Sequence, residues 1–76
     1  LSRVEGADAV LHHEGLRHFR VRNHGEIARV ELAQDEIPRL MESNRCTEIS
    51  ARLKKLGFKF VTVDLEGYRP GGVTLS

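Results

Sequence analysis

The chain is poor in cysteine and in aromatic residues: it has one cysteine, three phenylalanines, one tyrosine and no tryptophan among 76 residues. A single cysteine excludes an internal disulfide, and no Cys/His set has the spacing of a zinc site. No local basic side chain is fixed beside Cys46 to activate it. We therefore expect Cys46 to be a small core residue rather than a nucleophile.

Long hydrophobic runs and an excess of charge are also missing. No run approaches the roughly 18 apolar residues of a membrane helix, and no signal peptide is visible. Twelve Lys and Arg against eleven Asp and Glu give a net charge of +1, which provides no general attraction to nucleic acid or to a membrane. We expect a cytoplasmic protein with no membrane partner.

The length of the chain fits one small domain. Residues 1–76 lie near the lower limit for a single core without disulfides or metals, so we do not expect a large enclosed active site. Because the sequence starts at Leu1 rather than at Met, we expect it to be a fragment of a larger protein.

Hydrophobic periodicity and capping residues predict the order helix, strand, strand, helix, strand. Ser2 and Glu5 form a capping-box pattern at the start of the first helix, and Gly15 is suited to end it. The expected elements are a helix over 3–13, a β-hairpin over 19–32, a helical turn from Asp35, a helix over 45–56 and a strand over 58–65.

An internal repeat supports this division. An offset of 42 residues places Gly15 on Gly57 and Leu11 on Leu53. The same offset places Leu16 on Phe58 and Val21 on Val63. Both copies therefore predict a helix, a glycine and a strand, with the same side of the strand facing inward.

The hairpin carries an unusual concentration of arginine. With His24-Gly25 as its two-residue turn, Arg20 lies opposite Arg29, and Arg22 shares their face. The other face is apolar: Phe19, Val21, Ala28, Val30 and Leu32. Like charges that face each other across a ladder are unfavourable by up to about 1 kcal/mol, so fold stability does not explain the pairing.

Two explanations of the arginines remain open. Guanidinium groups bind phosphate and carboxylate through paired donors, which favours an anion-binding site. Alternatively, Glu31, Glu26 or a carboxylate on a neighbouring strand neutralises the patch, or the arginines are simply solvated.

The predicted fold class is α+β, an α-β-β-α-β two-layer sandwich with both helices on one face of the sheet. If the final crossover skips one position, the third strand lies antiparallel beside the first. That gives a three-stranded antiparallel sheet of order 2-1-3, a ferredoxin-like half. Period two places Val61, Val63 and Leu65 inward, and it places Phe58, Phe60, Thr62 and Asp64 on the open face.

Two segments carry a resemblance to a known family: FRVRNHGEIARVE over 19–31 and LGFKFVTVDLEGYR over 56–69. Together they resemble the C-terminal region of ATP-dependent sacrificial sulfur transferases of the LarE type, which belong to the PP-loop superfamily. The resemblance covers nearly the whole chain. It implies a parent enzyme that adenylates a carboxylate of a pyridinium mononucleotide and transfers sulfur from its own cysteine, producing the thiocarboxylated precursor of the nickel-pincer cofactor.

The resemblance also implies that the ATP site and the sulfur donor of the enzyme lie outside this chain. ATP and Mg would bind an N-terminal ATP-pyrophosphatase domain of the same protein, and the sulfur-donating cysteine would precede the matched region. The chain alone is then a non-catalytic module for substrate anchoring and oligomerisation, without a cofactor or metal of its own. The implied partners are that N-terminal domain, a small anionic substrate and further copies in a homo-oligomer.

The resemblance implies an anion-binding role for arginines of this chain. Arg20 and Arg22 match the family's Arg-x-Arg pair, Arg29 matches the arginine of the next strand, and Arg69 matches that of the closing loop. His24 is a further candidate. Many relatives have His-His-Gly where this chain has Asn-His-Gly, so a structural role for this turn residue stays open.

Two other functions fit the same residues. An open sheet face with arginines and Phe60 could stack bases in an RNA- or nucleotide-binding module, although aromatics are few. The domain could also be purely structural, docking on the rest of the protein through Ile27, Phe58 and Phe60. Steep salt dependence would favour RNA, and self-association would favour the docking domain.

Overall fold

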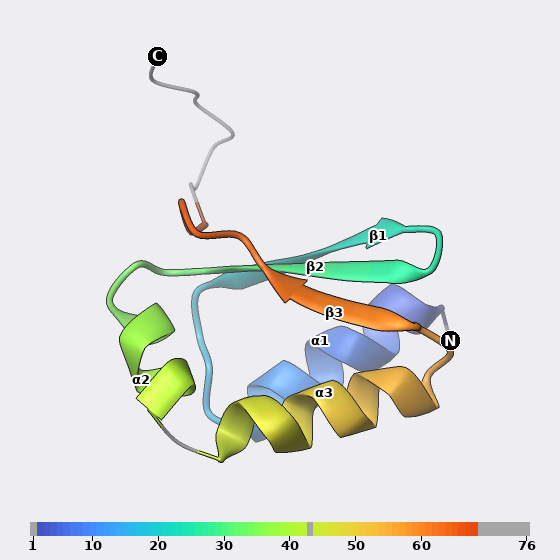
Figure 1. The fold of residues 1–76 in the computed structure, drawn as a ribbon, viewed down its shortest axis with the longest axis horizontal. Coiled ribbons are helices and arrows are strands. Elements are labelled where there is room, and N and C mark those ends of the chain that lie inside the picture. The colour runs from blue at the N-terminus through green and yellow to red at the C-terminus, as the bar shows by residue number, and fades with distance from the viewer. Residues whose placement is uncertain (1, 43, 69–76) are drawn as a thin grey trace.

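The computed structural model describes residues 2–42 and 44–68. A three-stranded sheet forms one layer, and helices α1 and α3 lie beneath it, while α2 sits at one end (Figure 1). The α+β class and the placement of both long helices on one face are confirmed. The elements are α1 (Arg3–His13), β1 (Phe19–His24), β2 (Ile27–Leu32), α2 (Glu36–Glu42), α3 (Arg45–Lys55) and β3 (Phe60–Val63). Within the described residues, no helix is long and apolar enough to cross a membrane.

Helix α1 begins and ends as its sequence predicts. The Glu5 amide donates to Ser2 Oγ at 3.2 Å, and the Ser2 amide donates to Glu5 Oε1 at 3.0 Å, which completes the capping box. At the other end Gly15 has a φ of +88°, and the Leu16 amide donates to the Leu11 carbonyl at 3.1 Å. This is a Schellman ending, which satisfies carbonyls that the helix itself leaves free.

The glycine inside α1 lies where the side chain that follows α3 packs against α1. Glycine in a helix interior costs about 1 kcal/mol relative to alanine. A Cβ atom on Gly6 would lie 3.0 Å from Cδ2 of Leu56, directly after α3. Gly6 therefore lets α1 and α3 pack closely under the sheet.

The order of the strands differs from the prediction. Strand β2 is central, with β1 antiparallel on one side and β3 parallel on the other, so the sheet is mixed and its order is β1-β2-β3. The predicted antiparallel sheet of order 2-1-3, and the ferredoxin-like half with it, are wrong. The physical reason lies at the hairpin turn, where the Glu26 carbonyl accepts from the amides of Lys59 at 2.8 Å and Phe60 at 3.1 Å. These bonds start β3 beside β2.

The register of the hairpin also differs, by two residues. The structure pairs Arg22 with Arg29 and Arg20 with Glu31, so the predicted pairing of Arg20 with Arg29 is wrong. The turn is centred on Gly25 and Glu26 rather than on His24 and Gly25. Gly25 has a φ of +62° and Glu26 has no positive φ, which is typical of a type II′ turn with glycine first. A shift of two residues leaves the faces unchanged.

The core lies between the sheet and the helices, and the predicted inward residues of β1 and β2 contribute to it. Two expectations for the third strand are wrong. Phe58, expected on the open face, is only 2% exposed, and Leu65, expected to face inward, is 84% exposed. Both lie outside β3, so period two does not apply to them. Phe58 follows Gly57 as Leu16 follows Gly15, and both are buried beneath the sheet. The buried apolar residues are Ala7, Leu11, Leu16, Val21, Ala28, Val30, Leu32, Leu40, Ile49, Leu53 and Phe58.

Cys46 lies on the core-facing side of α3, where the sequence predicts it. It is half-buried and lines an apolar cavity of about 230 Å³ together with side chains of α2, α3 and β3. A thiol in such surroundings packs as a small apolar side chain.

Candidate anion-binding site

Three arginines project from the face of the sheet that no helix covers. Arg20 and Arg22 alternate with the buried Val21 on β1, and Arg29 lies between the buried Ala28 and Val30 on β2. The side chains of Arg22 and Arg29 are 45% and 40% exposed. The predicted clustering of these arginines on one open face is therefore confirmed, although their order across the ladder differs.

One carboxylate lies among them. Glu31 is only 8% exposed, and its Oε2 lies 2.9 Å from Nη2 of Arg29 and 3.5 Å from Nε of Arg22. The neutralising explanation is thus correct for these two arginines. With Asp64 nearby, these five side chains of the described residues carry three positive and two negative charges, a net charge of +1. They form a mixed cluster rather than a purely basic patch.

Arg29 is the most restrained of the three arginines. Its Nε atom is buried without a hydrogen-bond partner, and Oδ2 of Asp64 lies 4.0 Å away, which is close enough for attraction but too far for a hydrogen bond. Asp64 is itself engaged, since its Oδ1 accepts from the Glu66 amide at 2.9 Å.

Arg20 has a different environment. In the described part of the chain no carboxylate lies within ion-pair distance of it; instead its Cζ lies 5.7 Å from the centre of the Tyr68 ring. The Tyr68 amide donates to the Leu32 carbonyl at 2.6 Å, which returns the loop after β3 to the end of β2. A Cβ on Gly67 would lie 2.7 Å from that carbonyl oxygen, so this return requires glycine.

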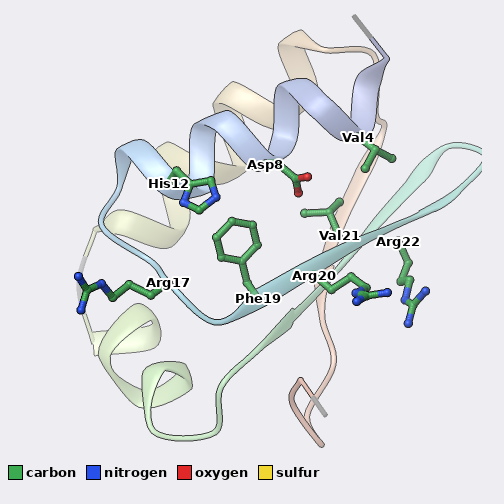
Figure 2. Close-up of a pocket in the computed structure, with 8 residues that line it drawn as sticks. All are labelled: Val4, Asp8, His12, Arg17, Phe19, Arg20, Val21 and Arg22. Atoms are coloured by element: carbon green, nitrogen blue, oxygen red, sulfur yellow. The ribbon is translucent and has the colours of Figure 1, made fainter. Parts of the chain in front are cut away.

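A cavity of about 480 Å³ follows the outer edge of β1 (Figure 2). Because an edge strand presents both faces, the cavity receives Phe19 and Val21 from the inner side and Arg20 and Arg22 from the outer side. Helix α1 supplies the opposite wall, and the His12 ring packs edge-on against Phe19 with a centroid distance of 4.8 Å. The lining residues are Val4, Asp8, His12, Arg17, Phe19, Arg20, Val21 and Arg22.

Sequence reasoning missed the contribution of α1 to this cavity. Val4, Asp8 and His12 are spaced by four residues, which places them on one side of a helix. That spacing was the available signal, but it does not reveal which strand the helix side faces. In Figure 2, Asp8 and His12 point from α1 toward β1.

Arg3 is a second residue that sequence reasoning missed. Its Nη2 donates to the Gly25 carbonyl at 2.8 Å, and its Nη1 donates to the Gly57 carbonyl at 3.1 Å. Its guanidinium also lies 4.6 Å from the centre of the Phe58 ring. Arg3 therefore joins the start of α1 to the hairpin turn at the end of β1 and to the glycine that follows α3 in the second repeat.

Two of the predicted site residues, Arg29 and His24, lie apart from this cavity. His24 ends β1 opposite Ile27, two residue pairs beyond Arg22, and it does not line the cavity. Arg69 lies outside the described residues. Among residues 2–42 and 44–68, no three His, Cys, Asp or Glu side chains come together as a metal site.

Comparison with known proteins connects the chain to one region of LarE-type enzymes. No family model matches it. Over 71 residues, 93% of the chain, it is 37% identical to pyridinium-3,5-bisthiocarboxylic acid mononucleotide synthase of Lactiplantibacillus plantarum, covering 25% of that protein. It is also 35% identical over 71 residues to an uncharacterised protein of Synechocystis, covering 26% of it. The chain spans about a quarter of the length of these curated relatives, so the likeness is a partial match.

Proposed function

We propose that the chain anchors the anionic substrate of an enzyme that makes a thiocarboxylated pyridinium mononucleotide, the precursor of the nickel-pincer cofactor. The observation that carries the proposal is the arginine pair, Arg20 and Arg22, beside a cavity at the edge of β1. The similarity to the Lactiplantibacillus plantarum synthase supports the substrate class. Arg20 and Arg22 bind phosphate or carboxylate oxygens, while Arg29 and Arg69 supply further positive charge.

The chemistry of the cavity suits a charged ring with an anionic group. Val4, Phe19 and Val21 offer apolar surface on which a ring can pack. The Asp8 carboxylate complements the positive charge of a pyridinium, and guanidinium groups match phosphate oxygens through paired donors. The same set of side chains would suit a neutral apolar ligand poorly.

Activation and sulfur transfer belong to other parts of the proposed enzyme. ATP and Mg would bind an N-terminal ATP-pyrophosphatase domain, for which this sequence has no Gly-rich phosphate loop. Cys46 packs against apolar side chains and is not the proposed sulfur donor. The module would work together with that domain and with further copies in a homo-oligomer.

Calorimetric titration of the purified protein with nicotinic acid mononucleotide, a carboxylated pyridinium mononucleotide, tests the proposal. We expect saturable binding that Arg20→Ala weakens about tenfold or more, since a hydrogen bond to a charged group is lost. The matched control is Arg39→Ala, which removes an exposed arginine of α2. A lower melting temperature with unchanged affinity in Arg20→Ala would assign Arg20 a structural role instead.

RNA binding is the second candidate, and the exposure of one aromatic residue favours it. Phe60 is 57% exposed on the same open face as Arg29, where a base could stack. An RNA complex should weaken steeply with added salt because several counterions are released, whereas a small-anion complex should weaken little. Phe60→Ala should reduce RNA affinity and leave mononucleotide affinity unchanged.

Docking on another part of the protein is the third candidate. Ile27 and Phe60 are 37% and 57% exposed and lie next to each other across β2 and β3. Phe58 was expected to join them, but it is buried and cannot form such a contact. Self-association of the isolated chain that Phe60→Ser abolishes would favour this role.

A further inference from the structure

The uncovered face of the sheet carries one carboxylate that is almost fully buried. Glu31 is the only charged or polar residue among the described ones that is less than 9% exposed. Burial of a carboxylate is unfavourable unless the group is paired with firm partners. Glu31 contributes no apolar surface to the core, because it lies on the side opposite to Val30 and Leu32.

The partners of Glu31 connect it to the cavity. Its Oε2 lies 2.9 Å from Nη2 of Arg29 and 3.5 Å from Nε of Arg22. Arg22 lines the cavity beside β1, whereas Arg29 does not. A carboxylate at Nε leaves the two terminal nitrogens of Arg22 available to an oxyanion.

We propose that Glu31 is a positioning residue of the anion-binding site, an inference that rests on the proposed function. Its carboxylate holds the Arg22 guanidinium by Nε, so that the terminal nitrogens are oriented before the ligand arrives. Arg29 holds Glu31 from the other side through the 2.9 Å contact. Arg20 lies outside this arrangement, over Tyr68, and binds the ligand without help from Glu31.

The sign of one mutational effect separates this role from simple neutralisation. If Glu31 only reduces the repulsion among three guanidinium groups, its removal raises the positive potential and strengthens anion binding. If Glu31 orients Arg22, its removal weakens binding, because the ligand must then order the arginine side chain itself.

Calorimetric titration with inorganic pyrophosphate at fixed ionic strength measures that sign. We expect Glu31→Gln to weaken pyrophosphate binding about three- to tenfold, because the ligand must then order the Arg22 side chain itself. The matched control is Asp64→Asn, which removes the same charge near Arg29 but not near Arg22. It should bind pyrophosphate at least as tightly as wild type. Equal or tighter binding by Glu31→Gln would overturn the inference.

A double-mutant comparison tests whether Glu31 affects binding through Arg22. In the Arg22→Ala background, Glu31→Gln should change the affinity by less than about twofold, since the oriented group is absent. An equal loss in both backgrounds would overturn the inference. Should Glu31→Gln fail to fold, Glu31→Asp keeps the charge and withdraws the carboxylate by one methylene. Weaker binding by a folded Glu31→Asp supports the positioning role, and unchanged affinity overturns it.

The outcomes also separate this inference from the proposed function. Absence of pyrophosphate binding by the wild type, or binding that Arg20→Ala leaves unchanged, overturns the proposed function and the inference with it. Binding that Arg20→Ala weakens but Glu31→Gln strengthens overturns only the positioning role.

Discussion

The two repeats of the chain share an architecture but differ in their side chains. In each repeat a long helix, a glycine with positive φ and a strand follow in order, and the two strands flank β2 in opposite directions (Figure 1). The offset of 42 places Arg20 on Thr62 and Arg22 on Asp64. The scaffold therefore occurs twice, whereas the arginine pair occurs only in the first repeat.

The helices show the same contrast at the two edges of the sheet. Val4, Asp8 and His12 of α1 correspond to Cys46, Ser50 and Lys54 of α3. Both sets line a surface cavity, the first beside β1 and the second along α3. Only the first cavity combines a carboxylate with arginines. The difference teaches that the fold supplies two similar edges and that a few side chains give only the first an arginine cluster beside a cavity.

The largest expected effect concerns the shared core. Leu11 and Leu53 occupy equivalent positions and are both 0% exposed. Each change to alanine should lower the free energy of unfolding by about 2–5 kcal/mol, because each leaves a cavity in a small core. Urea denaturation measures both values. A loss outside this range, of about 2–5 kcal/mol, for only one of the two variants would contradict the equivalence of the repeats.

Exchange of the strand residues should abolish the difference between the two edges in pyrophosphate binding. The double variant Arg20→Thr/Arg22→Asp gives the first repeat the residues of the second. We expect it to lose about a hundredfold in pyrophosphate affinity, or ~3 kcal/mol for two charged hydrogen bonds, and to unfold at a lower temperature because Glu31 loses one of its two guanidinium partners. Retained affinity would show that the anion site lies elsewhere.

A smaller effect on stability is expected when alanine replaces either of the two glycines that follow the long helices. Gly15 and Gly57 have φ values of +88° and +112°, so alanine costs about 1–2 kcal/mol at either site. A Cβ on Gly57 would also lie 3.3 Å from Cδ of Arg3, whereas Gly15 has only an arginine terminus 3.8 Å away. Gly57→Ala should therefore destabilise more than Gly15→Ala in thermal unfolding. The reverse order would contradict the role of Arg3 at this junction.

The smallest expected effect on stability concerns the N-terminal caps of the two long helices, α1 and α3. The hydrogen bond from the Ser2 amide, and then that from the Ser2 side chain, lower the pKa of Glu5 below its usual 4.5. A lowered folded-state pKa adds stability above the unfolded pKa, and this is lost as the pH falls through the folded value. Helix α3 lacks such a cap, because Asn44 makes no side-chain capping bond. Glu5→Gln should reduce the fall in melting temperature between pH 6 and pH 3; an unchanged fall would place the acid sensitivity elsewhere.

Local signals predicted the elements of this fold well, and long-range packing caused the errors. The Ser2 and Glu5 pattern, the stop at Gly15 and the inward side of β1 depend on neighbours in the sequence. The order of the strands depends on whether the last strand joins the free edge of β1 or the free edge of β2. The hairpin register depends on whether Gly25 is the first or the second residue of its turn, and both positions accept positive φ.

The candidate site was predicted in composition but not in geometry. Arg20, Arg22 and Arg29 lie on one open face, as the alternation along the hairpin requires. The contributions of Asp8 and Tyr68 come from elements distant in sequence, so no local pattern indicates them. Glu31 was considered as a neutralising residue, but its burial among the arginines follows only from the three-dimensional arrangement.

Chemical-shift mapping with pyrophosphate is the most direct test of the difference between the two edges. We expect shifts concentrated at the first edge, around Asp8, His12, Arg20 and Arg22, with the corresponding residues Ser50, Lys54, Thr62 and Asp64 unaffected. Shifts of similar size at both edges, or shifts confined to the second edge, would contradict the assignment of the anion-binding site to the first repeat.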